Sequence, residues 1–177
     1  FITRRKGELT INNETASFHF AADHSGLFPL IQEYRVPGDP FMCSFESLYR
    51  EMHISAFPAD TLAFLPALID LEEGKKLAIL EADLEDYPGM FLQPEKGSPN
   101  SLEGAFAGYP ARESLFQNKL NARVDGRENF IARVDGKHQV PWRILLISNT
   151  DRELLNNDMV QKLPAPSRVA DTSWIRP

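Results

Sequence analysis

The sequence predicts an all-β fold, a sandwich of many short strands with one or two short helices. Apolar and polar residues alternate with period two in several segments; within 15–22, for example, Phe18 and Phe20 share one face. Clusters of Gly, Pro, Asn and Asp bound these segments at short intervals, as turns do between strands. With 177 residues, of which 42% are hydrophobic, the chain has room for one domain with a substantial core.

Four segments in the first third of the chain are candidates for secondary structure. Residues 8–13, 15–22 and 29–36 are predicted as strands, and 29–36 has the weakest alternation. Segment 44–55 fits a strand, but its apolar residues would also line one face of a helix. Both alternatives stay open for this segment.

Residues 60–90 are predicted to form a β-hairpin. Two apolar runs flank the turn at 72–75, where Gly74 allows a positive φ. Pro66 cannot donate a backbone hydrogen bond, so it marks an edge, a strand start or a bulge. Because both runs are almost continuously apolar, we expect both faces of the hairpin to be covered, as in one sheet of a sandwich.

The next part of the chain is predicted as a loop followed by two short strands. Three Pro and three Gly mark 93–110 as the loop. The pentapeptide Ala-Arg-Val-Asp-Gly occurs at 122–126 and again at 132–136. Since Asp-Gly is a strong turn signal, each copy predicts a short strand closed by a turn.

The last part of the chain is predicted to contain one strand and one helix. Residues 139–148 form an apolar run that predicts a buried strand, with Trp142 packed in the core. Residues 150–163 follow with apolar residues at helical spacing. Thr150 or Asp151 is the expected N-cap of this helix.

Composition excludes several classes of function. The net charge of −6 disfavours nucleic acid or an anionic membrane surface as a partner, because either requires a basic patch. No apolar run approaches the roughly 20 residues of a membrane helix, and a single cysteine, Cys43, leaves no internal disulfide. The four histidines lack zinc-site spacing, and no phosphate-binding loop, dinucleotide fingerprint or nucleophile elbow is present. The sequence therefore contains no identifiable catalytic residue.

Four carboxylates in 81–86 are the main candidates for binding chemistry. On a strand, Glu81 and Asp83 would share one face about 7 Å apart, close enough to approach one hard cation. Glu81 also ends an apolar face, where a charge needs a partner. Glu85 and Asp86 are expected to be turn residues facing water. A solvated strand end and a metal or sugar contact completed from elsewhere both fit this pattern.

Several long stretches resemble the N-terminal domain of glycoside hydrolase family 97, the α-glucosidase and α-galactosidase family. These stretches are 60–92, 141–148, 153–163 and 166–177, with a weaker likeness at 18–24. The resemblance implies a β-super-sandwich similar to galactose mutarotase. It also implies a (β/α)8 barrel farther along the polypeptide, which carries the catalytic acids.

The resemblance implies that this chain is part of a longer protein. Residues 1–166 would be the N-terminal sandwich domain, without its first strands, and 167–177 would begin the linker into the barrel. The chain starts at Phe1 rather than Met and stops at Ser-Trp-Ile-Arg-Pro, and both ends are expected to be cuts. The chain alone is therefore expected to be inactive.

In the family, a glutamate of the N-terminal domain is a ligand of a calcium ion at the active site. The matching position is Glu81, with Glu85 as the competing alignment. The resemblance further implies an oligosaccharide substrate and a periplasmic location, and it identifies no substrate-binding residue in this chain. The alternative hypothesis is a free-standing carbohydrate-binding or structural sandwich without catalysis.

Overall fold

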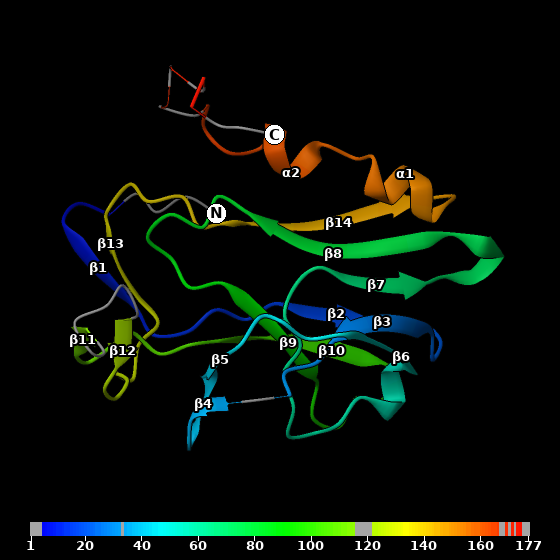
Figure 1. Cartoon of the computed structure of the whole chain (residues 1–177), viewed down its shortest axis with the longest axis horizontal. Helices are drawn as coiled ribbons and strands as arrows, with labels where there is room; N and C mark the ends of the chain where they lie inside the picture. Colours follow the sequence, from blue (N-terminus) through cyan, green and yellow to red (C-terminus); the bar gives the residue numbers. More distant parts are fainter. Residues whose placement is uncertain are drawn as a thin grey trace.

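A computed structural model describes residues 5–32, 34–115, 122–166, 169, 171, 173 and 174. Within these residues the fold is a set of antiparallel sheets with two short α-helices, which confirms the predicted all-β class (Figure 1). Among the described residues, no helix has the length and hydropathy to cross a membrane.

The largest sheet has five antiparallel strands in the order β14-β8-β7-β3-β6. Their bounds are Trp142–Ser148, Lys76–Ala82, Ala67–Asp70, Ser25–Pro29 and Tyr49–His53. β7 and β8 pair from Ala67 opposite Ile79 to Asp70 opposite Lys76, so the predicted hairpin is confirmed. Gly74 takes a φ of 72° in the connecting turn, and Pro66 directly precedes β7, as a strand start.

A three-stranded sheet contains β2 (Ser17–His19), β10 (Ser101–Phe106) and β9 (Met90–Pro94). The prediction of a loop over 93–110 is therefore wrong. The Gly and Pro content obscured a strand: a Cβ on Gly104 would lie 3.0 Å from the Met90 sulfur across the sheet. This glycine allows close packing between strands rather than a turn.

The core lies between these two sheets. Ala63 forms bridges to Leu30, just after β3, and to Leu92 on β9, so it joins the edges of the sheets. The largest fully buried side chains come from both sheets and from the short connections: Phe28, Ile54, Ile69, Ile79, Met90, Leu92 and Leu102.

Three further strand pairs complete the β structure. β1 (Glu8–Ile11) pairs with β13 (Ala132–Asp135), β11 (Glu113–Leu115) with β12 (Ala122–Val124), and β4 (Tyr34–Val36) with β5 (Asp39–Cys43). The predicted strands at 8–13 and at both copies of the repeated pentapeptide are thus confirmed. The predicted strand at 29–36 is divided, because β3 ends at Pro29 and β4 begins at Tyr34.

Segment 44–55 is a strand rather than a helix, since it contains β6 and the start of a 3-10 turn, η1 (Ile54–Ala56). The predicted helix at 150–163 is two short helices, α1 (Asp151–Leu155) and α2 (Met159–Lys162), which pack near β14 and β8.

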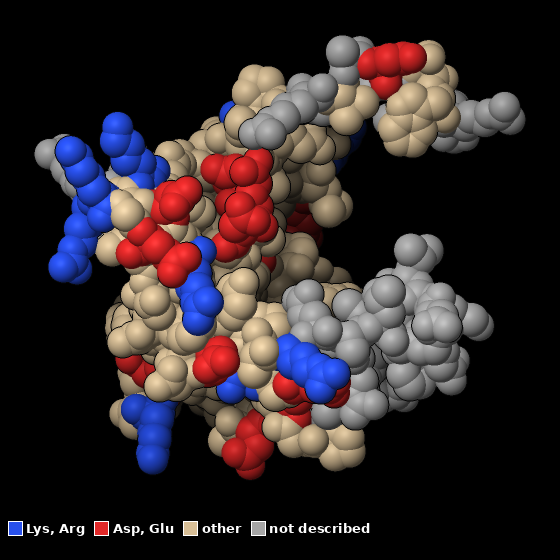
Figure 2. Space-filling view, turned by 90° about the vertical axis from the view of Figure 1, so that its left-hand side faces the viewer, with Lys and Arg blue, Asp and Glu red and all other residues tan. Residues whose placement is uncertain are grey.

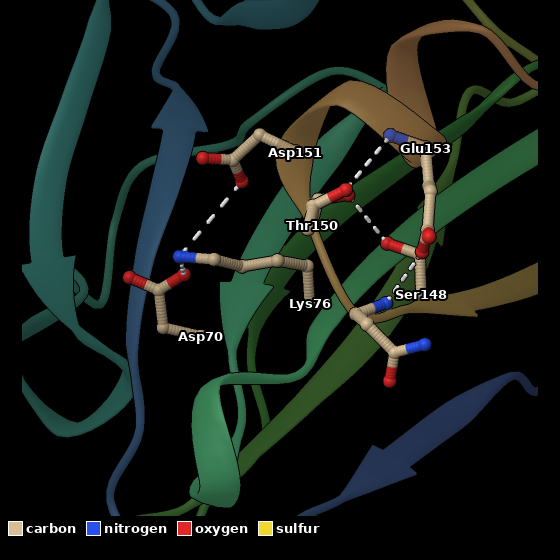
Figure 3. Close-up of polar contacts among 7 residues, drawn as sticks. Asp70, Lys76, Ser148, Thr150, Asp151 and Glu153 are labelled. Carbon is tan, nitrogen blue, oxygen red and sulfur yellow. Dashed lines mark hydrogen bonds and ion pairs between the residues drawn. The ribbon is translucent and has the colours of Figure 1, made fainter.

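The N-cap of α1 is Thr150, whose hydroxyl accepts a hydrogen bond from the Glu153 backbone N–H at 3.2 Å (Figure 3). The Glu153 carboxylate accepts one from the Asn149 N–H at 2.8 Å. Lys76 lies between Asp70 and Asp151 and links β8 to the start of α1.

Trp142 is 41% exposed, so the prediction that it packs in the core is wrong. It begins β14, an edge strand with a single neighbour, and one side of that strand has no further strand beside it among the described residues. The predicted linker start at 167–177 lies mostly outside the described residues.

Candidate functional site

The candidate site is built on a cross-strand pair of opposite charges. Glu81 on β8 lies directly opposite Arg143 on β14 in the antiparallel register. Residues opposite one another project to the same face, so the two side chains meet. On the same face, Leu77 and Ile79 are buried in the core, and Glu81 therefore continues a core-facing row.

Glu81 is firmly held through one of its two carboxylate oxygens. Its Oε2 accepts hydrogen bonds from Arg143 Nη1 at 2.7 Å and from the Met90 backbone N–H at 2.8 Å. The side chain is only 14% exposed. Among the described residues, none donates a hydrogen bond to Oε1.

Arg143 joins Glu81 to a second carboxylate. Its Nε and Nη2 donate to the two oxygens of Glu14 at 2.8 and 3.0 Å, a bidentate pair. Glu14 lies between β1 and β2 and is 129 residues away in sequence. The guanidinium also lies 5.0 Å from the centre of the Phe106 ring. Glu14, Arg143 and Glu81 together form a network, called the acid–arginine network below.

Tyr87 closes this network on the side of the loop after β8. Its ring is buried and lies 6.0 Å from the Arg143 guanidinium, and its hydroxyl is close enough to the Glu14 carboxylate to be affected by its charge. Burial, together with the nearby negative charge of Glu14, raises the pKa of Tyr87 well above 10.0. The hydroxyl is therefore protonated at neutral pH.

The pKa of Glu81 is raised above its ordinary value. Burial is the largest cause, because it disfavours the charged form. The Met90 N–H and the Arg143 charge act in the opposite direction, and the neighbouring Glu14 adds to the increase. A ligand that brought further positive charge to Glu81 would stabilise its ionised form.

The other acids of 81–86 do not join Glu81. β8 ends at Ala82, and Asp83 has a φ of 65°, which breaks the strand alternation. The prediction that Glu81 and Asp83 share a face is therefore wrong. Glu85 and Asp86 are exposed in a turn, as predicted. Acidic side chains, together with several Lys and Arg side chains, lie on the end of the molecule where β1 and β13 are found (Figure 2).

A cavity of about 590 Å³ adjoins the acid–arginine network, because Tyr87 contributes to its wall. Asp86 and Tyr109 also line it, and the Tyr109 side chain is 41% exposed. The guanidinium of Arg133, another lining residue, lies 5.8 Å from the centre of the Tyr109 ring. The cavity thus combines an aromatic surface with charged hydrogen-bonding groups.

At this site the described residues supply one oxygen for a hard cation, Oε1 of Glu81, rather than a complete set of ligands. No group of three or more His, Cys, Asp or Glu side chains among them is arranged to hold a metal ion. Calcium takes six to eight oxygen ligands, so Glu81 alone does not make a calcium site. A carboxylate with an unengaged Oε1 nevertheless fits the role of a single ligand.

Sequence reasoning missed Glu14 and Arg143. A signal for Arg143 was present in the sequence. Arg143 directly precedes the apolar run Ile-Leu-Leu-Ile, and a charged side chain buried beside such a run requires a partner. The identity of that partner had no signal, since Glu14 and Glu81 are distant in sequence from Arg143 and from each other.

Comparison with known proteins assigns the family. The model of the glycosyl-hydrolase 97 N-terminal family matches residues 1–166. The chain belongs to this family. A retaining alpha-galactosidase of Bacteroides thetaiotaomicron is 34% identical to this glycosyl-hydrolase 97 N-terminal chain over 181 residues. That alignment covers 100% of the chain and 27% of the relative, so the chain spans about a quarter of the relative's length.

Solved structures of family members share the fold of this glycosyl-hydrolase 97 N-terminal chain. A glycoside hydrolase family 97 enzyme from Pseudoalteromonas sp. strain K8, in complex with acarbose, aligns with a TM-score of 0.67 and 20% identity. The alignment covers 96% of this chain and 22% of that one. A variant of an enzyme from the same strain, in complex with panose, aligns with a TM-score of 0.62 at 20% identity, over 91% and 20% of the two chains. These likenesses show the fold.

Proposed function

We propose that this chain is the N-terminal accessory domain of a glycoside hydrolase that removes terminal α-linked galactose or glucose. The family match over 1–166 is the observation that carries this proposal. The name of the retaining alpha-galactosidase and the acarbose and panose complexes support an oligosaccharide as substrate. The catalytic acids belong to a (β/α)8 barrel of the same polypeptide, outside this chain.

In this proposal Glu81 supplies one ligand to a calcium ion whose other ligands come from the barrel. Its buried carboxylate, held through Oε2, has Oε1 left to meet a cation. When bound, calcium polarises the substrate or the attacking water by its charge. The part of this chain is to provide a fixed, negatively charged oxygen at the end of β8.

The test compares Glu81→Gln with Glu85→Gln in the full-length protein. We expect Glu81→Gln to abolish calcium binding measured by calorimetry and to remove the calcium dependence of hydrolysis of p-nitrophenyl α-galactoside or α-glucoside. Glu85→Gln, which removes the exposed carboxylate of the competing alignment, is expected to leave both unchanged. Intact calcium binding in Glu81→Gln would show that the ligand is assigned to the wrong residue.

The 177-residue chain by itself is expected to hydrolyse neither substrate, because it lacks the barrel. Measurable turnover by the purified chain would contradict the accessory role. We also propose a periplasmic location. Fractionation of the source cells tests this proposal, and recovery of the full-length protein with cytoplasmic markers would overturn it.

A second candidate function is carbohydrate binding without cleavage. The cavity of about 590 Å³ favours it, because the half-exposed Tyr109 ring and the neighbouring charged groups suit the apolar face and hydroxyls of a sugar. Calorimetry of the isolated chain with maltotriose or an α-galacto-oligosaccharide distinguishes the two functions. Heat of binding that Tyr109→Ala abolishes would favour this module; the absence of heat would exclude it.

A further inference from the structure

The acid–arginine network holds Glu81 more tightly than an ordinary surface ion pair would. Two donors fix Oε2, and one of them, the Met90 N–H, belongs to the backbone of β9. The other donor, Arg143, is itself fixed by the bidentate pair with Glu14 and by the Phe106 ring. The Glu81 carboxylate therefore has little freedom to rotate and exchange its two oxygens.

The charges of the network matter as much as its geometry. Glu14 and Arg143 neutralise each other, so the negative charge of Glu81 remains the net charge of the three groups. Without the charge of Glu14, Arg143 would neutralise Glu81 instead and would repel an approaching cation. Glu14 thus affects the attraction of Glu81 for a cation through its ion pair with Arg143.

We propose that Glu14 and Arg143 are positioning residues for the metal ligand Glu81. They hold it so that Oε1 alone is offered to the cation, and Glu14 preserves the negative charge of the pair. This inference rests on the proposed role of Glu81 as a calcium ligand. Groups that orient a metal ligand in this way typically contribute about 10- to 100-fold to metal affinity.

The experiment measures calcium dissociation constants of the full-length protein by calorimetry. Glu14→Gln keeps the size of the side chain and removes its charge, and we expect it to weaken calcium binding roughly 10- to 100-fold. The matched control is Glu103→Gln. Glu103 lines the same surface hollow as Glu14 and bonds to Gln93 rather than to Arg143, so its removal is expected to leave the constant within about twofold.

A second ion separates the charge effect from a purely structural one. Loss of a neighbouring negative charge weakens the binding of a trivalent ion more than that of a divalent ion, because the Coulomb energy scales with the charge of the ion. We therefore expect Glu14→Gln to reduce terbium affinity by a larger factor than calcium affinity. An equal reduction for both ions overturns the electrostatic role of Glu14.

The outcomes distinguish this inference from the proposed function. If Glu81→Gln abolishes calcium binding while Glu14→Gln binds calcium as the parent does, the positioning role is wrong and the ligand assignment stands. If Glu81→Gln binds calcium normally, the ligand assignment itself fails. Melting temperatures without calcium show whether each variant folds. If Glu14→Gln does not fold, the variant Arg143→Lys is measured instead. Lysine keeps the positive charge but lacks the planar guanidinium that bonds Glu14 and Glu81 at the same time.

Discussion

Replacement of Arg143 by methionine in this chain is expected to lower the free energy of unfolding by about 3–5 kcal/mol, the usual cost of breaking a buried ion pair from one side. The guanidinium makes three hydrogen bonds of 2.7–3.0 Å to two carboxylates whose side chains are 14% and 18% exposed. Methionine fills much of the volume beside Phe106 but leaves the Glu14 and Glu81 carboxylates without the positive charge of the guanidinium that they share.

This loss should be visible by thermal denaturation followed by circular dichroism. For a chain of this size, each kcal/mol corresponds to about 2–4 °C, so the melting temperature should fall by roughly 6–20 °C. The loss should shrink at acidic pH, because the pKa of Glu81 is raised by burial and its neutral form needs no positive partner. A triple variant that also carries Glu14→Gln and Glu81→Gln should recover most of the stability, since no buried charge is then unpaired.

Two results would refute this reasoning. If Arg143→Met changed the free energy of unfolding by less than about 1 kcal/mol, the ion pair would be as weak as an exposed surface pair, although it is buried. A triple variant no more stable than Arg143→Met would show that lost packing against Phe106, rather than unpaired charge, causes the destabilisation.

Three further predictions concern other parts of the chain. Tyr87→Phe should change how the free energy of unfolding depends on alkaline pH, because it removes the Tyr87 hydroxyl, whose pKa is raised by burial. Because the pKa of Tyr87 is raised in the folded state, its stabilising contribution is complete below pH 10.0 and is lost as the pH rises above that value; a parent–variant difference constant from pH 8 to 11 in urea titrations would contradict this. Gly26→Ala should lower the free energy of unfolding by about 1–3 kcal/mol, since the new Cβ would lie 2.6 Å from the Leu68 carbonyl oxygen within the sheet. A decrease of less than about 0.5 kcal/mol in urea denaturation would disprove this clash. Thr150→Ala should cost about 1 kcal/mol by removing the N-cap of α1, whereas Thr150→Ser should match the parent in the same assay.

The elements that sequence reasoning placed well are those whose signals are local. The β7–β8 hairpin follows from two apolar runs around a glycine turn, and the cap of α1 follows from Thr150 and Glu153. In both cases, residues only a few positions apart determine the backbone conformation. The same reasoning failed over 93–110, because Gly104 has a packing role that resembles a turn signal in the sequence.

The candidate site divides in the same way. The sequence alone identified the family through long ordered stretches, and that resemblance pointed to Glu81, with Glu85 as the competing alignment. It gave no role to Arg143 or to Glu14.

Only the tertiary structure decided which charges meet. The pairing of β8 with β14 places Glu81 opposite Arg143. The segment that connects β1 to β2 places Glu14, 129 residues away in sequence, beside the same arginine. Electrostatic contacts depend on distances of a few ångströms, whereas sequence patterns report only neighbours along the backbone. The sequence therefore determined that Glu81 is a candidate ligand, and the fold determined that one of its oxygens is already engaged.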